Sequence, residues 1–443
     1  MGEARGFSRG AVAAGALAGL LFGFDTAVIA GVTGAIRDNF QLSDWGFGAA
    51  MSAALWGTLA GALGAGLPGD RFGSRNVLIW IAIFYVVSAV GTALSWDLWS
   101  FALFRFIGGL AIGGSSVLAP VYISEISPAR RRGFLVGLFQ LNIVFGILAA
   151  YLSNFVVAQL VADDLEWRVK LGVAAVPAVI LLLTLLRIPQ SPRWLLVRGR
   201  RPEALAAIGR LGMGAPETVA AELEAIPQEG GADRLSWSRY RQPMMLAFAI
   251  AAFNQFSGIN AILYYLNDIF QGAGFSSVSA DLQAVAIGAA NFLATLLGLT
   301  LIDRMGRKPL LLTGAAGTCG ALIGVALIYS SGTGQVLLLP MLVVFITFFA
   351  ISQGAAIWVY LSEVFPTAVR ARGQSLGSAT HWGVNAVITQ VFPVVAAASL
   401  AGPFWFFAAA TAVQFFVVLR FFPETKGVSL EAMEATLARG SRR

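Results

Sequence analysis

The chain of 443 residues has few charged side chains, one cysteine and one histidine. Charged residues make up 12% of it, about half the share of a typical soluble domain. Cys319 alone cannot form a disulfide within the chain or build a cysteine-based metal site. One histidine leaves little acid–base chemistry, and no nucleophile–base constellation, phosphate loop or metal-ligand cluster is visible. We therefore expect neither an enzyme nor a bound cofactor.

Most residues of the chain are apolar. They make up 57% of the chain, the mean hydropathy is +0.76, and the 50 glycines allow membrane helices to approach closely. A run of about 20 apolar residues crosses the bilayer core. The sequence predicts an all-α membrane protein with about twelve transmembrane helices, near residues 11–33, 46–68, 76–95, 99–123, 133–157, 169–188, 244–271, 280–302, 309–329, 336–361, 373–398 and 403–422.

The basic residues are distributed unevenly between the two sides of these spans. On this division 26 of the 30 Lys and Arg fall on one side, and Arg37, Arg168 and Lys170 fall on the other. The positive-inside rule places both termini in the cytoplasm. We expect the protein to lie in the cell (inner) membrane, surrounded by the lipid bilayer. The net charge of +7 is therefore a topology signal and does not indicate a nucleic-acid partner.

Three short signatures occur twice, in the same order, about 235 residues apart. They are Asp70-Arg71-Phe72-Gly73-Ser74-Arg75 with Asp303-Arg304-Met305-Gly306-Arg307-Lys308, Ser124-Glu125…Arg132 with Ser362-Glu363…Arg370, and Pro189-Gln190-Ser191-Pro192-Arg193 with Pro423-Glu424-Thr425-Lys426-Gly427. A duplicated membrane protein of this kind places its site between two similar bundles.

The duplication predicts two pseudo-symmetric bundles of six helices each. The first spans residues 1–188 and the second 243–422, with a polar cytoplasmic linker at 189–242 and a tail at 423–443. Within the linker, 204–211 and 217–226 have the composition of short surface helices.

Asp25 lies near the middle of the first span. A carboxylate there costs about 2.5–3.5 kcal/mol on insertion scales, so an acid inside a membrane span is functional by default. Arg105, inside the fourth span, is its natural partner because an arginine stays charged and attracts the ionised carboxylate. A permanent structural ion pair, or an arginine that reaches for the interface near Asp97 and Trp99, is the alternative.

Six stretches, from Phe22 to Gly427, closely resemble the sugar porter family of the major facilitator superfamily. They are Phe22-Gly23-Phe24-Asp25-Thr26-Ala27-Val28-Ile29, Asp70-Arg71-Phe72-Gly73, Arg105-Phe106-Ile107-Gly108-Gly109, Pro120-Val121-Tyr122-Ile123-Ser124-Glu125, Asn254-Gln255-Phe256-Ser257-Gly258-Ile259-Asn260 and Pro423-Glu424-Thr425-Lys426-Gly427. The resemblance implies a monomer with the major facilitator fold that imports a monosaccharide, hexose or pentose. It also implies proton coupling, because proton-coupled members carry Asp at position 25 and facilitators carry Asn.

Carboxamides suit a sugar site because each offers one acceptor oxygen and two donor hydrogens. Span seven supplies Asn254, Gln255 and Asn260, with Tyr264 four residues later. Gln255 and Asn260 are about 140° apart on a helix, so they border one cavity only if it is wide or the helix breaks at Gly258. By resemblance the cavity is also lined by Gln140, Asn291, Trp358, His381 and Trp382.

His381 departs from the family, whose symporters carry Gln and whose facilitators carry Asn at this position. An imidazole donates and accepts hydrogen bonds and titrates near pH ~6.5, which would add a second pH dependence. A neutral, packed histidine is about equally compatible with the sequence.

By resemblance, charges at the cytoplasmic helix ends close that side of the protein: Asp70, Arg71, Arg75, Glu125, Arg132, Asp303, Arg304, Arg307, Glu363 and Arg370. Ser74 replaces a usual Arg and Gln190 a usual Glu, and both changes remove charged members of this network. Gly354 is not followed by the family's proline, and Ile147 stands where sugar symporters often have Gln.

Two other functions remain open. A facilitated uniporter has the same architecture, and only uptake with and without an uncoupler separates it from a symporter. A membrane sugar sensor is disfavoured because the tail after Phe422 is only about twenty residues long.

Overall fold

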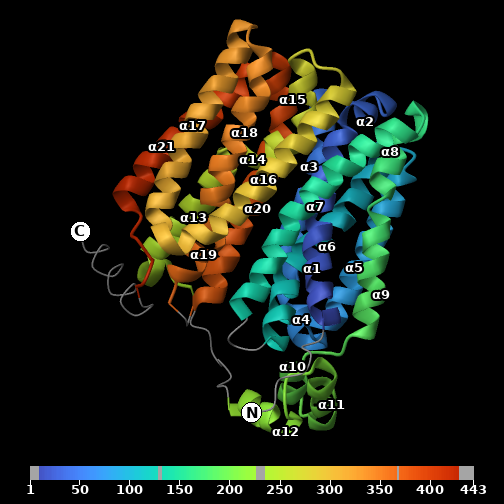
Figure 1. Cartoon of the computed structure of the whole chain (residues 1–443), viewed down its shortest axis with the longest axis vertical. Helices are drawn as coiled ribbons and strands as arrows, with labels where there is room; N and C mark the ends of the chain where they lie inside the picture. The colour runs from blue at the N-terminus through green and yellow to red at the C-terminus, as the bar shows by residue number, and fades with distance from the viewer. Residues whose placement is uncertain (1–8, 128–131, 226–234, 367–368, 429–443) are drawn as a thin grey trace. The chain divides into compact units, whose positions relative to one another are not determined.

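The computed structural model describes residues 9–127, 132–225, 235–366 and 369–428, and each regular element in these ranges is a helix (Figure 1). Twelve helical stretches of this part of the chain are long and apolar enough to span a membrane. The predicted all-α, twelve-span architecture is therefore confirmed. The seventh span differs most from its prediction: it covers Trp237–Tyr264 and not 244–271.

The described chain groups into two compact units. The first contains residues 1–28, 56–150 and 161–230, and the second contains 29–55, 151–160 and 231–443. Short pieces of the N-terminal half thus group with the C-terminal half, so the predicted division into 1–188 and 243–422 stays a prediction.

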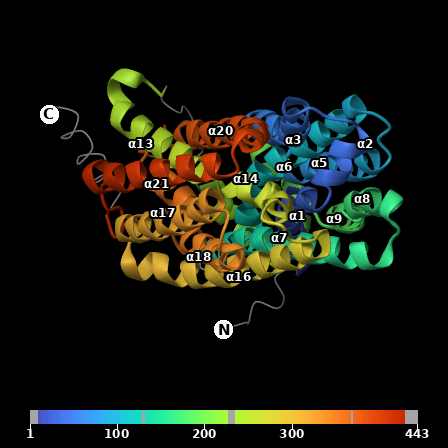
Figure 2. The same ribbon diagram turned by 90° about the horizontal axis from the view of Figure 1, so that it is seen from above.

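The first unit is built from long helices, with short ones at the ends. They are α1 (Arg9–Val28), α4 (Gly66–Phe72), α5 (Ser74–Ala93), α6 (Leu98–Ile126), most of α7 (Arg132–Leu160), α8 (Asp163–Gly172), α9 (Ala175–Arg187), α10 (Pro192–Val197), α11 (Arg201–Leu211) and α12 (Pro216–Ala225). Helix α3 (Asp44–Gly64) crosses the boundary between the units. Figure 2 shows α5 and α6 side by side.

The second unit begins with two short helices and continues with the C-terminal spans. They are η1 (Ile29–Gly31), α2 (Thr33–Asn39), α13 (Trp237–Phe256), α14 (Ile259–Tyr264), α15 (Leu266–Gly272), α16 (Ser277–Met305), α17 (Arg307–Ser331), η3 (Gln335–Leu337), α18 (Leu338–Phe349), η4 (Ala350–Gly354), α19 (Ala355–Glu363), α20 (Arg370–Ala398) and α21 (Ala401–Phe421). Helices α17 and α21 pack side by side (Figure 2).

Glycines let α1 and α7 approach almost backbone to backbone. A Cβ on Gly23 would stand 1.8 Å from the carbonyl oxygen of Ile143, and one on Gly146 would stand 2.1 Å from that of Leu20. Membrane helices lack a hydrophobic drive to associate, so such close contact is a main source of their packing energy. It fixes the position of α1, the helix that carries Asp25.

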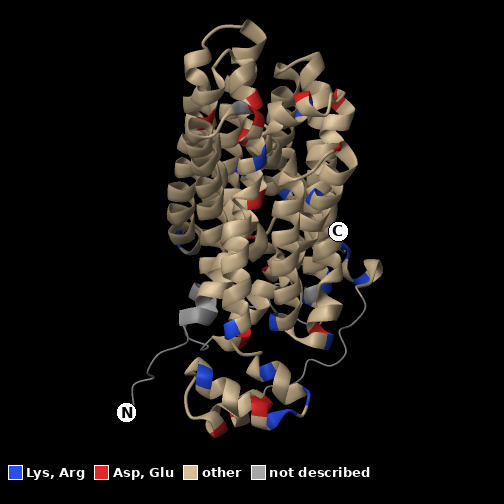
Figure 3. Cartoon of the chain, turned by 90° about the vertical axis from the view of Figure 1, so that its right-hand side faces the viewer, with Lys and Arg blue, Asp and Glu red and all other residues tan. Residues whose placement is uncertain are grey.

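The linker forms three short helices at one end of the first unit (Figure 1). Two of them, α11 and α12, confirm the predicted helices at 204–211 and 217–226, and the sequence reading missed α10. That helix begins at Pro192, and the Ser191 hydroxyl accepts a hydrogen bond from the backbone N–H of Trp194 at 3.3 Å. Charged residues colour these short helices and the helix ends, whereas the bodies of the long helices are mostly uncharged (Figure 3).

The seventh span is broken at Gly258. Helix α13 ends at Phe256, Gly258 has a left-handed backbone with φ +80°, and α14 begins at Ile259. A Cβ at position 258 would also lie 2.3 Å from the Phe407 ring. The helix break that the sequence allowed is present, and it changes the direction in which Asn260 projects.

We expect Gly258→Ala to destabilise the protein. The left-handed conformation costs an L-residue about 1–2 kcal/mol, and contact with the Phe407 ring adds to that cost. Thermal unfolding in detergent should therefore begin at a lower temperature. Gly320→Ala is the matched control, because Gly320 is helical and nothing lies within 4 Å of its Cβ position. Equal unfolding temperatures for the two variants would contradict the role assigned to Gly258.

Candidate functional site

Asp25 on α1 and Arg105 on α6 form a buried ion pair within the first unit. Nη1 of Arg105 donates to Oδ1 of Asp25 at 2.9 Å, and the two residues are 6% and 4% exposed. Oδ2 of Asp25 and Nε of Arg105 have no hydrogen-bond partner among the described residues. The pairing expected from the sequence is present, with one carboxylate oxygen left over.

A cluster of carboxamides surrounds Gln255 in the second unit. Its Nε2 donates to Oδ1 of Asn254 at 2.9 Å, and its Oε1 accepts from Nδ2 of Asn260 at 2.9 Å. Asn254 and Gln255 are buried, and Asn260 is half-buried. The break at Gly258 thus brings Gln255 and Asn260 into direct contact, which an unbroken helix would not do.

His381 on α20 joins this cluster. Both of its ring nitrogens lie within 3.2 Å of Nε2 of Gln255, so the imidazole contacts the carboxamide. Its ring centroid lies 5.2 Å from that of Trp358 and 4.9 Å from that of Trp382. Trp382 is buried, whereas Trp358 is 37% exposed. Part of the Trp358 side chain can therefore contact the apolar face of a bound ring.

The remaining residues proposed for the sugar site are more dispersed. Tyr264 is buried at the end of α14 and Asn291 is buried on α16, both in the second unit. Gln140 is half-buried on α7 of the first unit. The structure thus brings together Asn254, Gln255, Asn260, Trp358, His381 and Trp382.

The sequence reading missed several buried carboxamides in the second unit, among them Asn385, Gln353 and Gln414. Asn385 lies four residues after His381, on the same face of α20, and its Nδ2 has no partner among the described residues. Gln353 donates through Nε2 to Oε1 of Gln414 at 3.1 Å. The spacing of four from His381 was a usable signal for Asn385, but no local pattern links Gln353 to Gln414.

Gln353 lies in η4, a π-helical turn that interrupts the tenth span. Such turns often occur at functional sites. The turn ends at Gly354, the glycine that the family's proline does not follow in this chain.

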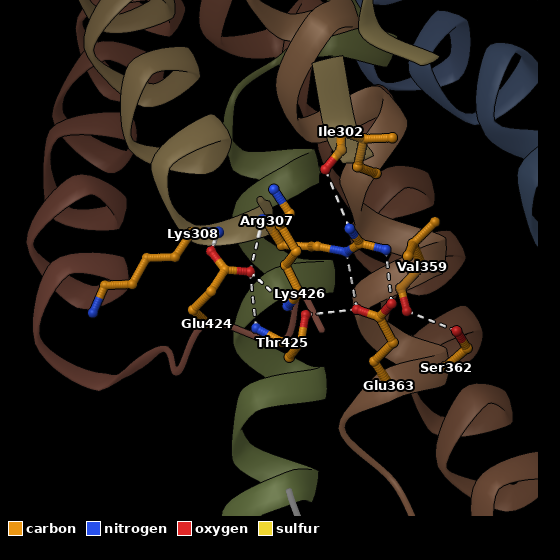
Figure 4. Close-up of polar contacts among 9 residues, drawn as sticks. All are labelled: Ile302, Arg307, Lys308, Val359, Ser362, Glu363, Glu424, Thr425 and Lys426. Carbon is orange, nitrogen blue, oxygen red and sulfur yellow. Dashed lines mark hydrogen bonds and ion pairs between the residues drawn. The ribbon is translucent and has the colours of Figure 1, made fainter. Parts of the chain in front are cut away.

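At the end of the second unit, Arg307 forms a two-pronged ion pair with Glu363 (Figure 4). Nη2 donates to Oε1 at 2.8 Å and Nε donates to Oε2 at 3.1 Å. The Thr425 hydroxyl donates to the same carboxylate at 2.5 Å. This planar geometry is the strongest form of arginine–carboxylate contact.

Glu424 caps the first turn of α17 in the same cluster. Its carboxylate accepts hydrogen bonds from the backbone N–H groups of Arg307, Lys308, Thr425 and Lys426 (Figure 4). Partial burial alone raises the pKa of a carboxyl, but these four bonds outweigh it and hold the pKa of Glu424 below its ordinary value. Their stabilisation is therefore present at neutral pH and is lost only when acid protonates the carboxylate.

The first unit repeats this arrangement with an uncharged residue at two of its positions. Ser74 stands where Arg307 stands, and its hydroxyl donates to Glu125 at 3.0 Å. Gln190 stands where Glu424 stands, and its Oε1 accepts from the backbone N–H of Arg75 at 3.2 Å. The sequence predicted that Ser74 and Gln190 remove charged members of this network; they keep some of its hydrogen bonds but cannot form the arginine–carboxylate pair.

The other proposed gate residues lie on several helices of the two units. Asp70 and Arg71 are exposed on α4, where the Asp70 carbonyl accepts from Nε1 of Trp194 at 2.9 Å. Arg304 is exposed, its carbonyl accepts from Nζ of Lys426 at 2.7 Å, and Arg370 is half-buried at the start of α20. The side chains of Arg132 and Asp303 lie outside the described residues.

The chain matches the model of one protein family over almost its entire length. The family is described as "Sugar (and other) transporter", and the match covers residues 11–437. The chain belongs to this family. The resemblance seen in the sequence motifs is thereby confirmed, and the multi-span membrane character of the protein with it.

Curated relatives cover the chain and are covered by it. The chain is similar to an arabinose-proton symporter of Bacillus subtilis, with 36% identity over 95% of this chain and 93% of the relative. It is also similar to the glucose transporter GlcP of Staphylococcus epidermidis, with 37% identity over 96% of each chain.

Solved structures show the same fold. The chain is similar to the xylose transporter XylE from E. coli, with 29% identity, a TM-score of 0.84 and coverage of 95% of this chain and 99% of XylE. Another structure, of this "proton:xylose symporter" bound to 6-bromo-6-deoxy-D-glucose, superposes with a TM-score of 0.77. The predicted major facilitator fold is confirmed.

We expect Arg307→Ser to destabilise the protein by about 2–3 kcal/mol, because it leaves the partly buried carboxylate of Glu363 without its charged donor. The reverse change, Ser74→Arg, supplies Glu125 with the arginine that the repeat has lost. Unfolding temperatures in detergent should fall for the first variant and rise for the second. A loss of stability in both variants would show that the two clusters are not equivalent.

Proposed function

We propose that this protein imports a monosaccharide together with a proton, by alternating access across the cell membrane. The observation that carries the proposal is the buried Asp25–Arg105 pair with its spare carboxylate oxygen. An acid in a membrane span that can take up a proton and release a cation is what a proton-coupled carrier requires. The names of the relatives, which include an arabinose-proton symporter, support this choice.

The ion pair provides the energetic coupling. While Asp25 is ionised, its charge and that of Arg105 compensate each other inside the membrane. Protonation of Asp25 removes one charge, so the attraction is lost and Arg105 is free to find other partners. The relative stability of two arrangements of the helices then depends on the proton, which is what drives uphill transport.

The carboxamide cluster around Gln255 is the proposed sugar site. Asn254, Gln255 and Asn260 supply donors and acceptors, and the Trp358 ring supplies an exposed apolar face. Gln140, Tyr264, Asn291, His381 and Trp382 complete it in our proposal. Hexoses and pentoses both present hydroxyls of this kind, and relatives are named for arabinose, xylose, glucose and galactose.

The placement in the membrane is also part of the proposal. We assign both termini and the linker helices to the cytoplasm from the charge asymmetry between loops, and we take the protein to act as a monomer. The clusters at Arg307 and Ser74 would then lie at the cytoplasmic end, where they bias which side is open.

Asp25→Asn should abolish concentrative uptake but keep sugar exchange. Asn is neutral at all pH values, so the accumulation ratio in proteoliposomes should fall to about 1 while counterflow of labelled sugar stays within severalfold of wild type. The exposed Asp38 gives the matched control Asp38→Asn, which should accumulate sugar normally. Uphill uptake by the Asp25 variant would disprove coupling through this residue, and an uncoupler without effect on wild type would indicate a uniporter.

Gln255→Leu should weaken sugar binding about 10- to 100-fold. The change removes hydrogen bonds to a sugar and leaves Asn260 and His381 without their shared partner. The concentration for half-maximal uptake, measured with a panel of L-arabinose, D-xylose, D-glucose and D-galactose, gives the effect. Gln283→Leu is the control, because buried Gln283 bonds Ser279 on its own helix. An equal effect of both changes would refute the site.

A further inference from the structure

Three buried polar atoms near the ion pair have no hydrogen-bond partner among the described residues. They are Oδ2 of Asp25, Oγ of Ser88 and Oγ1 of Thr92. The three residues are 6%, 1% and 2% exposed. A buried polar atom without a hydrogen bond costs free energy inside a membrane protein. These three atoms are therefore sites where a hydrogen-bonding molecule can bind.

Ser88 and Thr92 differ in this respect from other hydroxyl residues of the spans. Such residues commonly bond a carbonyl of their own helix. Ser116 bonds the Gly113 carbonyl at 2.7 Å, and Thr318 bonds that of Gly314 at 2.8 Å. Thr411 likewise bonds the Phe407 carbonyl at 2.7 Å. The hydroxyls of Ser88 and Thr92 are therefore available to hydrogen-bond a water molecule.

Gly108 on α6 lets Ser88 pack closely against α6 beside Asp25. The position that a Cβ on Gly108 would occupy lies 2.3 Å from Oγ of Ser88 and 3.9 Å from Oδ2 of Asp25. The Ser88 hydroxyl and the free carboxylate oxygen are therefore at most 6.2 Å apart, so water can link these two unsatisfied atoms.

The hydroxyls form a row along one face of α5. Tyr85, Ser88 and Thr92 are spaced by three and four residues, so they share the face that packs on α6. Thr92 lies one turn beyond Ser88, next to the end of α5 at Ala93. In the proposed orientation that end is the external one. The row therefore leads from the external end of α5 towards Asp25.

The ionisable groups around this row are few. Beside Asp25 lie Arg105 on α6 and the Tyr85 hydroxyl, which shares a hydrogen bond of 3.0 Å with Ser115. The described part of α9, which also packs on α1, contributes only Arg187 at its far end.

Helix α8 covers the outer end of α5. Its Arg168 donates to the carbonyls of Ala93 and Ser95 at 2.7 and 2.9 Å, and its buried Lys170 pairs with Glu166 at 2.5 Å. The cations of Arg168 and Lys170 are thus held by partners, and the row itself is neutral, which suits the passage of a proton by hydroxyls and water.

We propose that Ser88 and Thr92 hold water between the external end of α5 and Oδ2 of Asp25, and that the coupling proton travels along this water. Ser88 and Thr92 would act on the proton through this water, so they are positioning residues. This inference rests on the proposed proton coupling. A hydronium at the outer end gives a proton to the first water, each water passes one on, and the carboxylate of Asp25 receives one. One O–H bond forms at Oδ2, and one neutral water remains in place of the hydronium.

The test uses the full-length protein in proteoliposomes, with labelled L-arabinose, D-xylose and D-glucose in parallel. The variants are Thr92→Val, which has nearly the same shape without the hydroxyl, and Ser88→Ala/Thr92→Val. We expect sugar-induced proton uptake to slow about tenfold in the double variant, with a larger solvent isotope effect in D2O. Counterflow exchange should stay within twofold of wild type.

Matched variants separate this effect from general damage. Thr318→Val and Ser116→Ala remove hydroxyls that bond their own helix, so they should leave proton uptake unchanged. Ser88→Thr/Thr92→Ser keeps both hydroxyls and should restore the rate.

Proton uptake at the wild-type rate in the double variant, or an equal loss of counterflow, would overturn the proposal. Wild-type protein that moves sugar without protons would instead refute the proposed function, a result that is seen before any variant is measured.

Discussion

Two opposite charges buried in a membrane span constrain the whole first unit. Asp25 and Arg105 compensate each other only while α1 and α6 hold them at hydrogen-bond distance. The position of α1 must therefore be fixed closely, and the glycine contacts of Gly23 and Gly146 with α7 fix it. The glycine contacts between α1 and α7 and the charge pair between α1 and α6 have different roles. The first holds the helix, and the second makes its position depend on a proton.

The duplicated halves keep their geometry and vary their charge. Gly73 and Gly306 both have positive φ ahead of a long helix. The hydroxyls of Tyr122 and Tyr360 both donate to the carbonyl of the proline that begins the third repeated signature, Pro189 and Pro423. These features depend on backbone shape, which tolerates little change. The ion pair of Arg307 is replaced by a single hydroxyl at Ser74. The Arg307 cluster and the Ser74 cluster therefore differ in strength. The same small change in free energy affects the ends of the two units differently.

The sequence predicted what depends on averaged composition or local chain geometry. Hydropathy averaged over the length of a span indicates burial in lipid, so the sequence predicted the twelve spans. Helical composition in the polar linker predicted α11 and α12. Arg105 was identifiable because it is a lone cation within an apolar run. Gly258 was identifiable because Gln255 and Asn260 can border one cavity only if it is wide or the helix breaks there. The contact of Gln353 with Gln414 and the π-helical turn that carries Gln353 were not accessible. They depend on how distant helices pack, and neither leaves a periodic trace in the chain.

Ser88 and Thr92 show the same limit from the opposite side. A Ser or Thr in a membrane helix ordinarily satisfies its own hydroxyl, and nothing in the letters of the sequence separates the residues that do so from those that do not. Only the arrangement of α5 against α6, with Gly108 facing Ser88, shows that these hydroxyls are unsatisfied and lie beside Asp25. An acid that must exchange a proton from within lipid needs a polar route as well as a counter-charge. In this chain Arg105 supplies the counter-charge at one carboxylate oxygen, which leaves the other oxygen as the place where a route can end.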